Sequence, residues 1–190
     1  MSIATDTIGI RLPTAPRPPA VQAPTFTLDA PLAGRRIGLR TDAAWRSWQL
    51  IATEWDAFLQ RDGATTLAVE TQAQVGKGGS QDRVNIAAWS DEIDGGFVGL
   101  GTCGSCTSFS VHDAVTLEQH NKPSVVVVCS EFETHARNMA RFLGHGDLKV
   151  LVMPYPLEAR PDEELRAIAL EYYPQALALL GVEVAAGAGT

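Results

Sequence analysis

The sequence predicts an α/β fold in which a mostly parallel, five-stranded sheet lies between two layers of helices. From residue 34 onward, short apolar segments alternate with segments of helical periodicity. The apolar segments at 125–128 and 150–153 are continuous rather than alternating, which is typical of parallel strands buried on both faces. Right-handed crossovers then produce a three-layer, doubly wound sheet, for which we expect the flavodoxin-like strand order 2-1-3-4-5.

The first half of the predicted domain contains a long amphipathic helix with three tryptophans on its apolar face, which are core or subunit-contact residues by their three- and four-residue spacing. The glycine-rich segment 75–80 is expected to be a flexible loop, and a possible lid over a site. The elements expected in this half are a strand at 35–40, a helix from Thr41 or Asp42 to about Arg61, a strand at 64–71 and a helix at about 81–91.

The second half repeats the alternation of strand and helix, with helix ends marked by capping residues, prolines and glycines. The elements expected here are a strand at 96–100, a helix from Ser105 or Thr107 to about 120, a strand at 124–129, a helix at about 132–143, a strand at 148–153 and a helix from Pro161 to about 180.

The chain divides into a proline-rich N-terminal arm, residues 1–33, and a single α/β domain, residues 34–190. Six prolines in the arm prevent helix formation and favour extended backbone. Apolar residues scattered among them would let the arm lie along a partner subunit, in a homo- or hetero-oligomer. A disordered leader is the alternative interpretation.

Composition and charge exclude several classes of protein. The net charge of the 190-residue chain is −7, which argues against a nucleic-acid surface, because phosphate binding needs clustered Lys and Arg. No apolar run reaches the roughly 18 residues of a membrane-spanning helix, and no basic, apolar leader suggests secretion. We therefore expect a cytoplasmic protein. Three cysteines in such a chain fit catalytic or metal chemistry better than a disulfide scaffold.

Two of the three cysteines stand in the motif Cys103-Gly104-Ser105-Cys106, between the predicted third strand and the helix after it. Ligands of doubly wound sheets bind at the carboxyl ends of the strands, where this motif is expected to lie. A helix N-terminus offers unpaired N–H groups and a positive dipole end, both of which lower the pKa of a thiol. Such a spacing suits a redox pair in which one thiol attacks and the other resolves.

Other residues at the same edge are candidates for supporting roles. Hydroxyls and helix N–H groups would stabilise a thiolate, Gly104 permits a tight turn, and an arginine after the first strand adds positive charge. The third cysteine is either a second resolving thiol or part of a pocket wall, and the histidine in the helix either orients a group or packs. These supporting candidates are Thr102, Gly104, Ser105, Thr107, Cys129, Arg40 and His112.

Three other interpretations of these residues stay open. The cysteines could bind zinc with a histidine as fourth ligand, either His112 or His135, although no second C-x-x-C motif strengthens this. Residues 99–104 also fit the G-x-G-x-x-G pattern of dinucleotide sites, but on the third strand rather than the first. The two thiols could also be buried as small apolar groups. We expect no cofactor, with zinc as the alternative.

The segment 99–113, GLGTCGSCTSFSVHD, resembles the signature of the UGSC-type proteins, in some of which selenocysteine occupies the first motif position. Residues 122–129 and 150–157 agree with that family's fourth and fifth strands, so the resemblance covers about 34–180. The chain is therefore similar to a cysteine-containing form. More distantly, it is similar to the selenoprotein B subunits of glycine and proline reductases, which cleave carbon–heteroatom bonds reductively.

The resemblance implies an oxidoreductase in which Cys103 attacks a small-molecule substrate and Cys106 resolves to a disulfide. Selenium is useful where an atom must be ionised and nucleophilic near neutral pH, which implies that the residue in the selenocysteine position attacks. A thiol reductant system would regenerate the pair. The alternatives are a metal-binding protein and a non-catalytic subunit of a larger complex.

Overall fold

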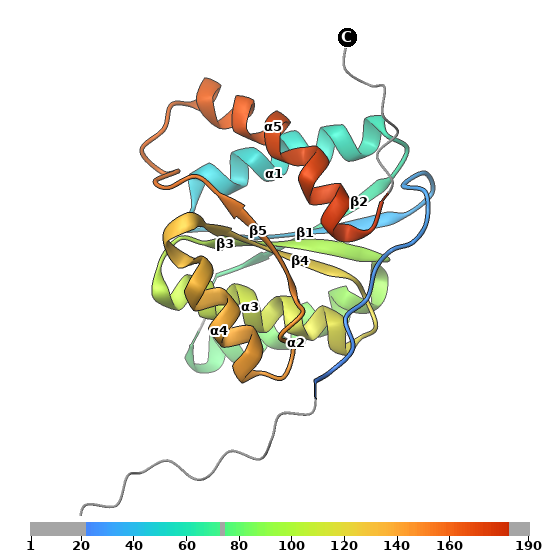
Figure 1. Ribbon diagram of the computed structural model, residues 1–190, viewed down its shortest axis with the longest axis vertical. Coiled ribbons are helices and arrows are strands. Elements are labelled where there is room, and N and C mark those ends of the chain that lie inside the picture. Colours follow the sequence, from blue (N-terminus) through green and yellow to red (C-terminus); the bar gives the residue numbers. More distant parts are fainter. Residues whose placement is uncertain (1–21, 73–74, 183–190) are drawn as a thin grey trace, which may run out of the picture.

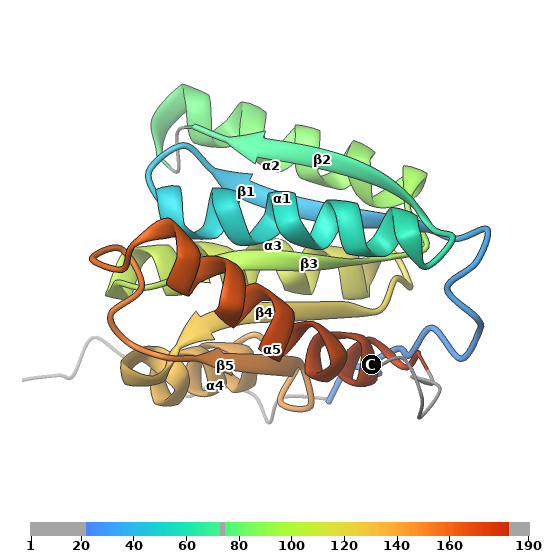
Figure 2. The same ribbon diagram turned by 90° about the horizontal axis from the view of Figure 1, so that it is seen from above.

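The computed structural model describes residues 22–72 and 75–182, which form a parallel five-stranded sheet covered by helices on both faces (Figures 1 and 2). The strand order is β2-β1-β3-β4-β5, and every neighbouring pair is parallel. This confirms the predicted flavodoxin-like α/β fold. The strands are β1 (Arg36–Asp42), β2 (Thr65–Thr71), β3 (Gly95–Gly101), β4 (Ser124–Cys129) and β5 (Lys149–Met153).

Two layers of helices bury the two faces of the sheet. Helices α1 (Arg46–Arg61) and α5 (Asp162–Leu180) cover one face, and α2 (Gly76–Glu92), α3 (Gly104–Gln119) and α4 (Glu133–Phe142) cover the other (Figure 1). In β4, Val125 and Val127 join the core beneath α1 and α5, while Val126 and Val128 join the core beneath α2, α3 and α4. Because both sets are buried, the strand needs apolar residues at every position.

The N-cap residue of α1 is Trp45, three or four residues after the predicted caps Asp42 and Thr41. Strand β1 continues through Asp42, and the Asp42 carboxylate accepts a hydrogen bond from the backbone N–H of Ala44 at 3.0 Å. Asp42 therefore holds a turn between strand and helix instead of capping the helix. The expected apolar face of α1 is confirmed, since Trp48 and Trp55 are fully buried.

The prediction of a loop at 75–80 is wrong, because α2 already begins at Gly76. A positive φ of 68° at Gly76 lets the chain turn sharply into the helix, and glycine adopts that conformation without steric cost. The Ser80 hydroxyl donates to the Gly76 carbonyl at 3.1 Å within the first turn. Tertiary context thus overrides the low helix propensity of the glycines.

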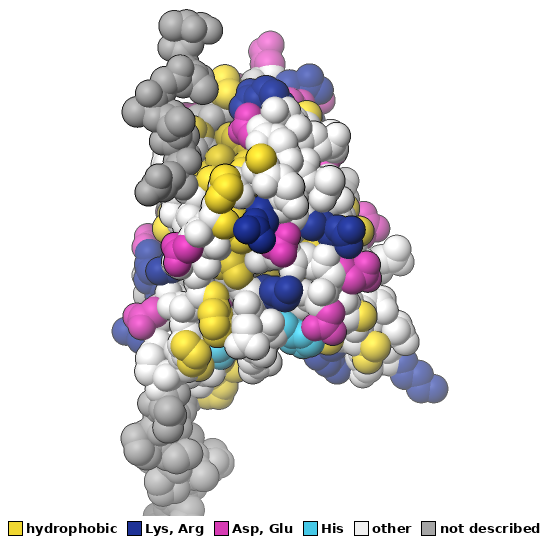
Figure 3. Space-filling view, turned by 90° about the vertical axis from the view of Figure 1, so that its right-hand side faces the viewer, with side chains coloured by type: hydrophobic (Ala, Val, Ile, Leu, Met, Phe, Trp, Pro, Cys, Tyr) yellow, Lys and Arg dark blue, Asp and Glu magenta, His cyan; other side chains and the backbone are white. Residues whose placement is uncertain are grey.

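The described part of the arm, residues 22–33, crosses the amino ends of the strands (Figure 1). It bonds to its own domain: Ala23 N–H donates to the Gly144 carbonyl and Leu28 N–H to the Leu180 carbonyl, both at 2.8 Å. On this end of the molecule, basic and acidic side chains are interspersed among uncharged ones (Figure 3). Residues 1–21 lie outside the described residues, so docking of the arm on a partner stays a prediction.

None of the helices among the described residues is long and apolar enough to cross a membrane.

Candidate functional site at the carboxyl ends of the strands

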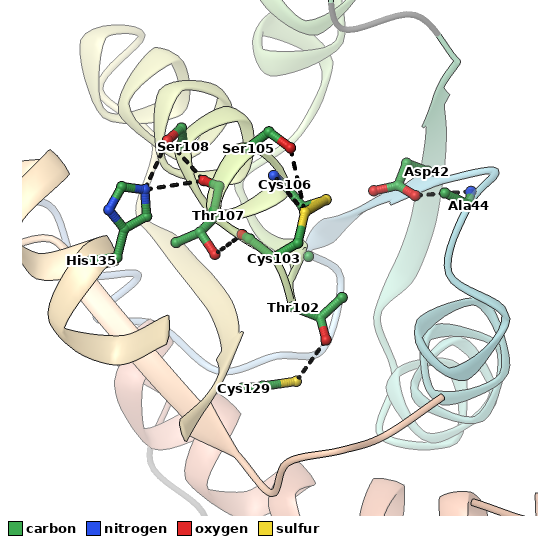
Figure 4. The surroundings of a disulfide bond; sticks show 12 residues. Asp42, Ala44, Thr102, Cys103, Ser105, Cys106, Thr107, Ser108, Cys129 and His135 are labelled. Carbon is green, nitrogen blue, oxygen red and sulfur yellow. Dashed lines mark hydrogen bonds between the residues drawn. A yellow bond between two sulfur atoms is a disulfide. The ribbon is translucent and has the colours of Figure 1, made fainter. Parts of the chain in front are cut away.

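Strand β3 delivers the Cys-Gly-Ser-Cys motif to the first turn of α3. Cys103 has an extended backbone and is the N-cap residue of this helix, where its sulfur accepts a hydrogen bond from the Cys106 N–H at 3.1 Å (Figure 4). The prediction that Ser105 or Thr107 caps the helix is therefore wrong, because a sulfur takes the position that an oxygen usually holds. The first thiol of the motif thus lies at the positive end of a 16-residue helix.

Cys103 and Cys106 are joined as a disulfide, with their Cα atoms 5.2 Å apart (Figure 4). Both residues are half-buried, so the pair belongs neither to the core nor to a freely exposed loop. The Ser105 hydroxyl lies 3.4 Å from the Cys103 sulfur. The hydroxyls of Ser105 and Thr107 were both expected to stabilise a thiolate, and the Ser105 hydroxyl is the one of the two that lies against the Cys103 sulfur.

The backbone of the motif is held by side chains that do not reach the sulfur atoms. The Thr107 hydroxyl donates to the Cys103 carbonyl at 2.7 Å. The Ser108 hydroxyl donates to the Gly104 carbonyl at 3.0 Å, and His135 Nε2 lies 3.0 Å from the same oxygen and 2.9 Å from Ser108 Oγ. His135 comes from α4, so it ties the start of α3 to a neighbouring helix (Figure 4).

Packing accounts for two glycines of the G-x-G-x-x-G pattern. A Cβ at Gly99 would lie 2.6 Å from the Trp48 ring, and a Cβ at Gly101 would lie 2.7 Å from Val128. Both distances are shorter than real contacts of a Cβ atom. These positions therefore need glycine for close approach within the protein, whether or not a nucleotide binds.

Arg40 is fully buried beneath this edge, and it bonds to the protein rather than to the thiols. Its Nη1 donates to the Gly99 carbonyl at 2.6 Å and lies 3.4 Å from an Asp42 carboxylate oxygen, while its Nη2 forms an ion pair of 2.9 Å with Asp113. Burial raises the pKa of Asp42 and of Asp113, and the guanidinium opposes that rise. The charge of Arg40 is thus largely compensated by two carboxylates.

A cavity of about 220 Å³ lies beside this ion network, between α2 and α3. His112 and Phe109 line it from α3, Arg83 lines it from α2, and Arg40 lines it from β1. His112 is therefore placed at the cavity wall. Sequence reasoning missed Arg83, because the segment before it was taken for a loop.

Cys129 ends β4 with its side chain buried in the core beneath α1 and α5. Its thiol donates to the Thr102 hydroxyl at 3.5 Å, which links it to the residue before Cys103 (Figure 4). Burial raises the pKa of the Cys129 thiol. Within residues 22–72 and 75–182, no three His, Cys, Asp or Glu side chains are grouped so that they could hold a metal ion.

Comparison with models of protein families gives a match over most of the chain. The model of the UGSC family matches residues 9–182, which also takes in most of the arm that the expected resemblance left out. None of the curated proteins compared with the chain matches it, and the more distant similarity to selenoprotein B subunits has no support from the family match. The match and a cysteine pair at disulfide distance are compatible with thiol redox chemistry. The chain belongs to the UGSC family.

Proposed function

We propose that the protein is a thiol-dependent redox enzyme in which Cys103 attacks a small electrophilic substrate and Cys106 resolves the product to a disulfide. The observation that carries this proposal is the hydrogen bond from the Cys106 N–H to the Cys103 sulfur at the N-cap of α3. A thiolate there replaces the oxygen that normally accepts from the first turn. The bond and the helix dipole favour the ionised sulfur, which is the nucleophile.

The reaction needs two steps and transfers two electrons from the thiols to the substrate. The Cys103 thiolate attacks the electrophilic atom, a sulfur–substrate bond forms, and the leaving group departs with its electron pair. The Cys106 thiolate then attacks the Cys103 sulfur, so that the disulfide forms and the substrate fragment leaves with the electron pair of its bond to sulfur and takes up a proton. An external dithiol returns the pair to its reduced form by thiol–disulfide exchange.

The surroundings of the pair suit these steps. Cys103 and Cys106 are only three positions apart with Cα atoms at 5.2 Å, so resolution needs little movement of the backbone. The Thr107 and Ser108 hydroxyls fix the carbonyls of Cys103 and Gly104, which keeps the first turn of the helix in place. Cys129 has a buried thiol and no contact with the pair among the described residues, so we assign it to the wall of the site.

Reaction of the reduced protein with 5,5′-dithiobis(2-nitrobenzoate) tests the order of the two thiols. We expect the native protein to release two equivalents of thionitrobenzoate and to close the Cys103–Cys106 disulfide. The Cys106→Ser variant should release one equivalent and keep the other as a mixed disulfide on Cys103. If Cys103→Ser reacts as fast as the native protein, Cys106 is the attacking thiol and the proposed order is wrong.

Metal content separates this proposal from the zinc alternative. We expect protein purified without added metal to contain much less than one equivalent of zinc. One tightly bound equivalent that is lost in Cys129→Ser would contradict the redox assignment, because a thiolate that serves as a zinc ligand is not free to attack a substrate while the metal is bound.

A further inference from the structure

The cavity between α2 and α3 opens at the same edge of the sheet as the thiol pair. Its walls come from the last residues of β1 and β2, from the first two turns of α2 and from the part of α3 that follows the motif. Cys106, Phe109 and Asp113 are spaced by three and four residues, so they lie on one side of α3. The cavity therefore begins three residues, about 4.5 Å along the helix axis, beyond Cys106.

The cavity wall carries two arginines and two aspartates, and Arg83 is the arginine that lies outside the ion pairs of the described residues. Asp113 is paired with Arg40, and the Asp82 carboxylate accepts a hydrogen bond from the Gln72 N–H at 3.1 Å. Arg83 donates to the Ser80 hydroxyl at 3.1 Å and takes part in none of the ion pairs among the described residues. An exposed guanidinium thus stands at the mouth of the cavity.

The floor of the cavity also has an unused hydrogen-bond donor. Arg40 is 0% exposed, and its Nε has no hydrogen-bond partner in the described part of the chain. A buried donor without an acceptor typically costs about 1–3 kcal/mol. Guanidinium groups match the geometry of carboxylates, and the ring of Phe109 offers an apolar surface to a short carbon chain.

We propose that this cavity binds the carboxylate of a small organic acid, whose electrophilic atom then lies against the Cys103–Cys106 pair. The proposal rests on the proposed function and adds the chemical class of the substrate. A volume of about 220 Å³ is below the range of sites for drug-sized ligands, so the cavity suits an acid of only a few carbon atoms. Arg83 binds the carboxylate at the mouth of the cavity.

Two alkylating reagents that differ only in charge test the proposal. N-iodoacetylglycine carries a carboxylate, and N-iodoacetylglycinamide carries a neutral amide; with either one a thiolate forms a sulfur–carbon bond and iodide leaves. We expect the reduced protein to react about threefold to tenfold faster with the carboxylate reagent, the size of a modest ion-pair contribution. Raising the salt concentration should reduce this ratio by screening the charges.

Matched variants locate the effect. Arg83→Gln should bring the ratio of the two rates towards one, whereas Arg141→Gln, an exposed arginine on α4 away from the cavity, should leave it unchanged. A ratio at or below one in the native protein, or equal ratios in the two variants, overturns the proposal. Circular dichroism confirms that both variants are folded.

A second measurement separates this proposal from the thiol chemistry. Acetylglycine, which has no reactive carbon, is titrated into the oxidised protein while backbone amide shifts are followed by NMR. Saturable shifts in α2 and α3 that weaken in Arg83→Gln support the cavity even if the thiols prove unreactive. Their absence, combined with fast reaction of the neutral reagent, contradicts the cavity and leaves the proposed nucleophile intact.

Discussion

Two buried charged side chains, Glu118 near one end of the sheet and Arg40 near the other, differ in how completely the protein satisfies their polar atoms. At the amino ends, Glu118 is 2% exposed, and its carboxylate accepts from the Phe26 N–H at 2.9 Å and from both the N–H and the hydroxyl of Ser124 at 3.0 Å. At the carboxyl ends, Arg40 is equally buried but keeps an unused donor beside a cavity. The protein itself supplies all the donors that the Glu118 carboxylate accepts, whereas one donor of Arg40 stays without an acceptor in the described part of the chain.

The described part of the arm and the thiol pair lie at opposite ends of the sheet. Residues 22–33 bring backbone donors and acceptors to the amino ends, where the strands start and the helices finish. The helix N-termini point to the other end, and with them the positive dipole ends that favour an anion or a thiolate. If residues 22–33 crossed the carboxyl ends of the strands instead, they would cover the site.

The largest effect is expected from removing the buried cation. Arg40→Met leaves Asp42 and Asp113 buried without their guanidinium, which should lower the free energy of unfolding by about 3–5 kcal/mol. Denaturant titration at pH 7 measures this loss, with Arg141→Met as the exposed control. An effect as small as that of the control would show that the ion network does not stabilise this end.

The same variant has a predicted pH dependence. Burial raises the pKa of both carboxyls in the native state, so their ionised forms lower the free energy of unfolding. A carboxyl with a raised native pKa contributes stability at low pH that is lost as the pH rises through that pKa. The deficit of Arg40→Met should therefore shrink when the titration is repeated near pH 4, where the carboxyls take up protons.

The next largest effect is expected near the amino ends of the strands, at Glu118. Glu118→Ala removes the acceptor of two buried donors and one half-buried donor, which should lower the free energy of unfolding by about 2–3 kcal/mol. Amide exchange at Phe26 should speed up, because its N–H loses its partner. Glu171→Ala on the exposed side of α5 is the control. Unchanged exchange at Phe26 would mean that Glu118 does not hold the arm.

Reduction of the disulfide should have a smaller effect on stability. The bond closes a loop of only four residues, for which chain entropy gives roughly 2 kcal/mol. Most of the fold is held by the two apolar cores, so the reduced protein should keep its circular dichroism spectrum and lose only a few degrees in Tm. Unfolding on reduction would identify the disulfide as a structural staple.

The smallest effect is expected at the link between α3 and α4. His135→Ala removes the ring that contacts the Gly104 carbonyl and the Ser108 hydroxyl, at a cost of about 1 kcal/mol. The first turn of α3 should then be less ordered, with faster amide exchange at Cys106. His120→Ala, at the other end of α3, is the control, and equal exchange in the two variants would rule out this role.

Much of the fold was predictable because it follows from local patterns. The strand at 124–129 is correct to the residue, since a run of four valines buried on both faces admits few alternatives. The prediction missed the start of α2 because glycine has a low helix propensity. The tertiary context that overrides this propensity is not visible in the sequence.

The site was predictable only in part. The sequence predicted that the cysteine pair and Arg40 lie at this edge of the sheet, but it indicated neither the partners of Arg40 nor the cavity. Contacts such as Arg40 with Asp113, or His135 with Ser108, join elements far apart in the chain, and no spacing rule indicates them. Neither could the sequence show that Thr107 bonds to a carbonyl rather than to sulfur.

The central claim is that the N-cap position activates Cys103, and a pH titration of alkylation tests it most directly. The reduced Cys106→Ser variant is treated with iodoacetamide from pH 5 to 10, and mass spectrometry follows Cys103 and Cys129 separately. We predict an apparent pKa for Cys103 clearly below the ~8.5 of free cysteine. Cys129, whose pKa is raised by burial, should react only at higher pH. An apparent pKa for Cys103 at or above that of free cysteine would contradict the account.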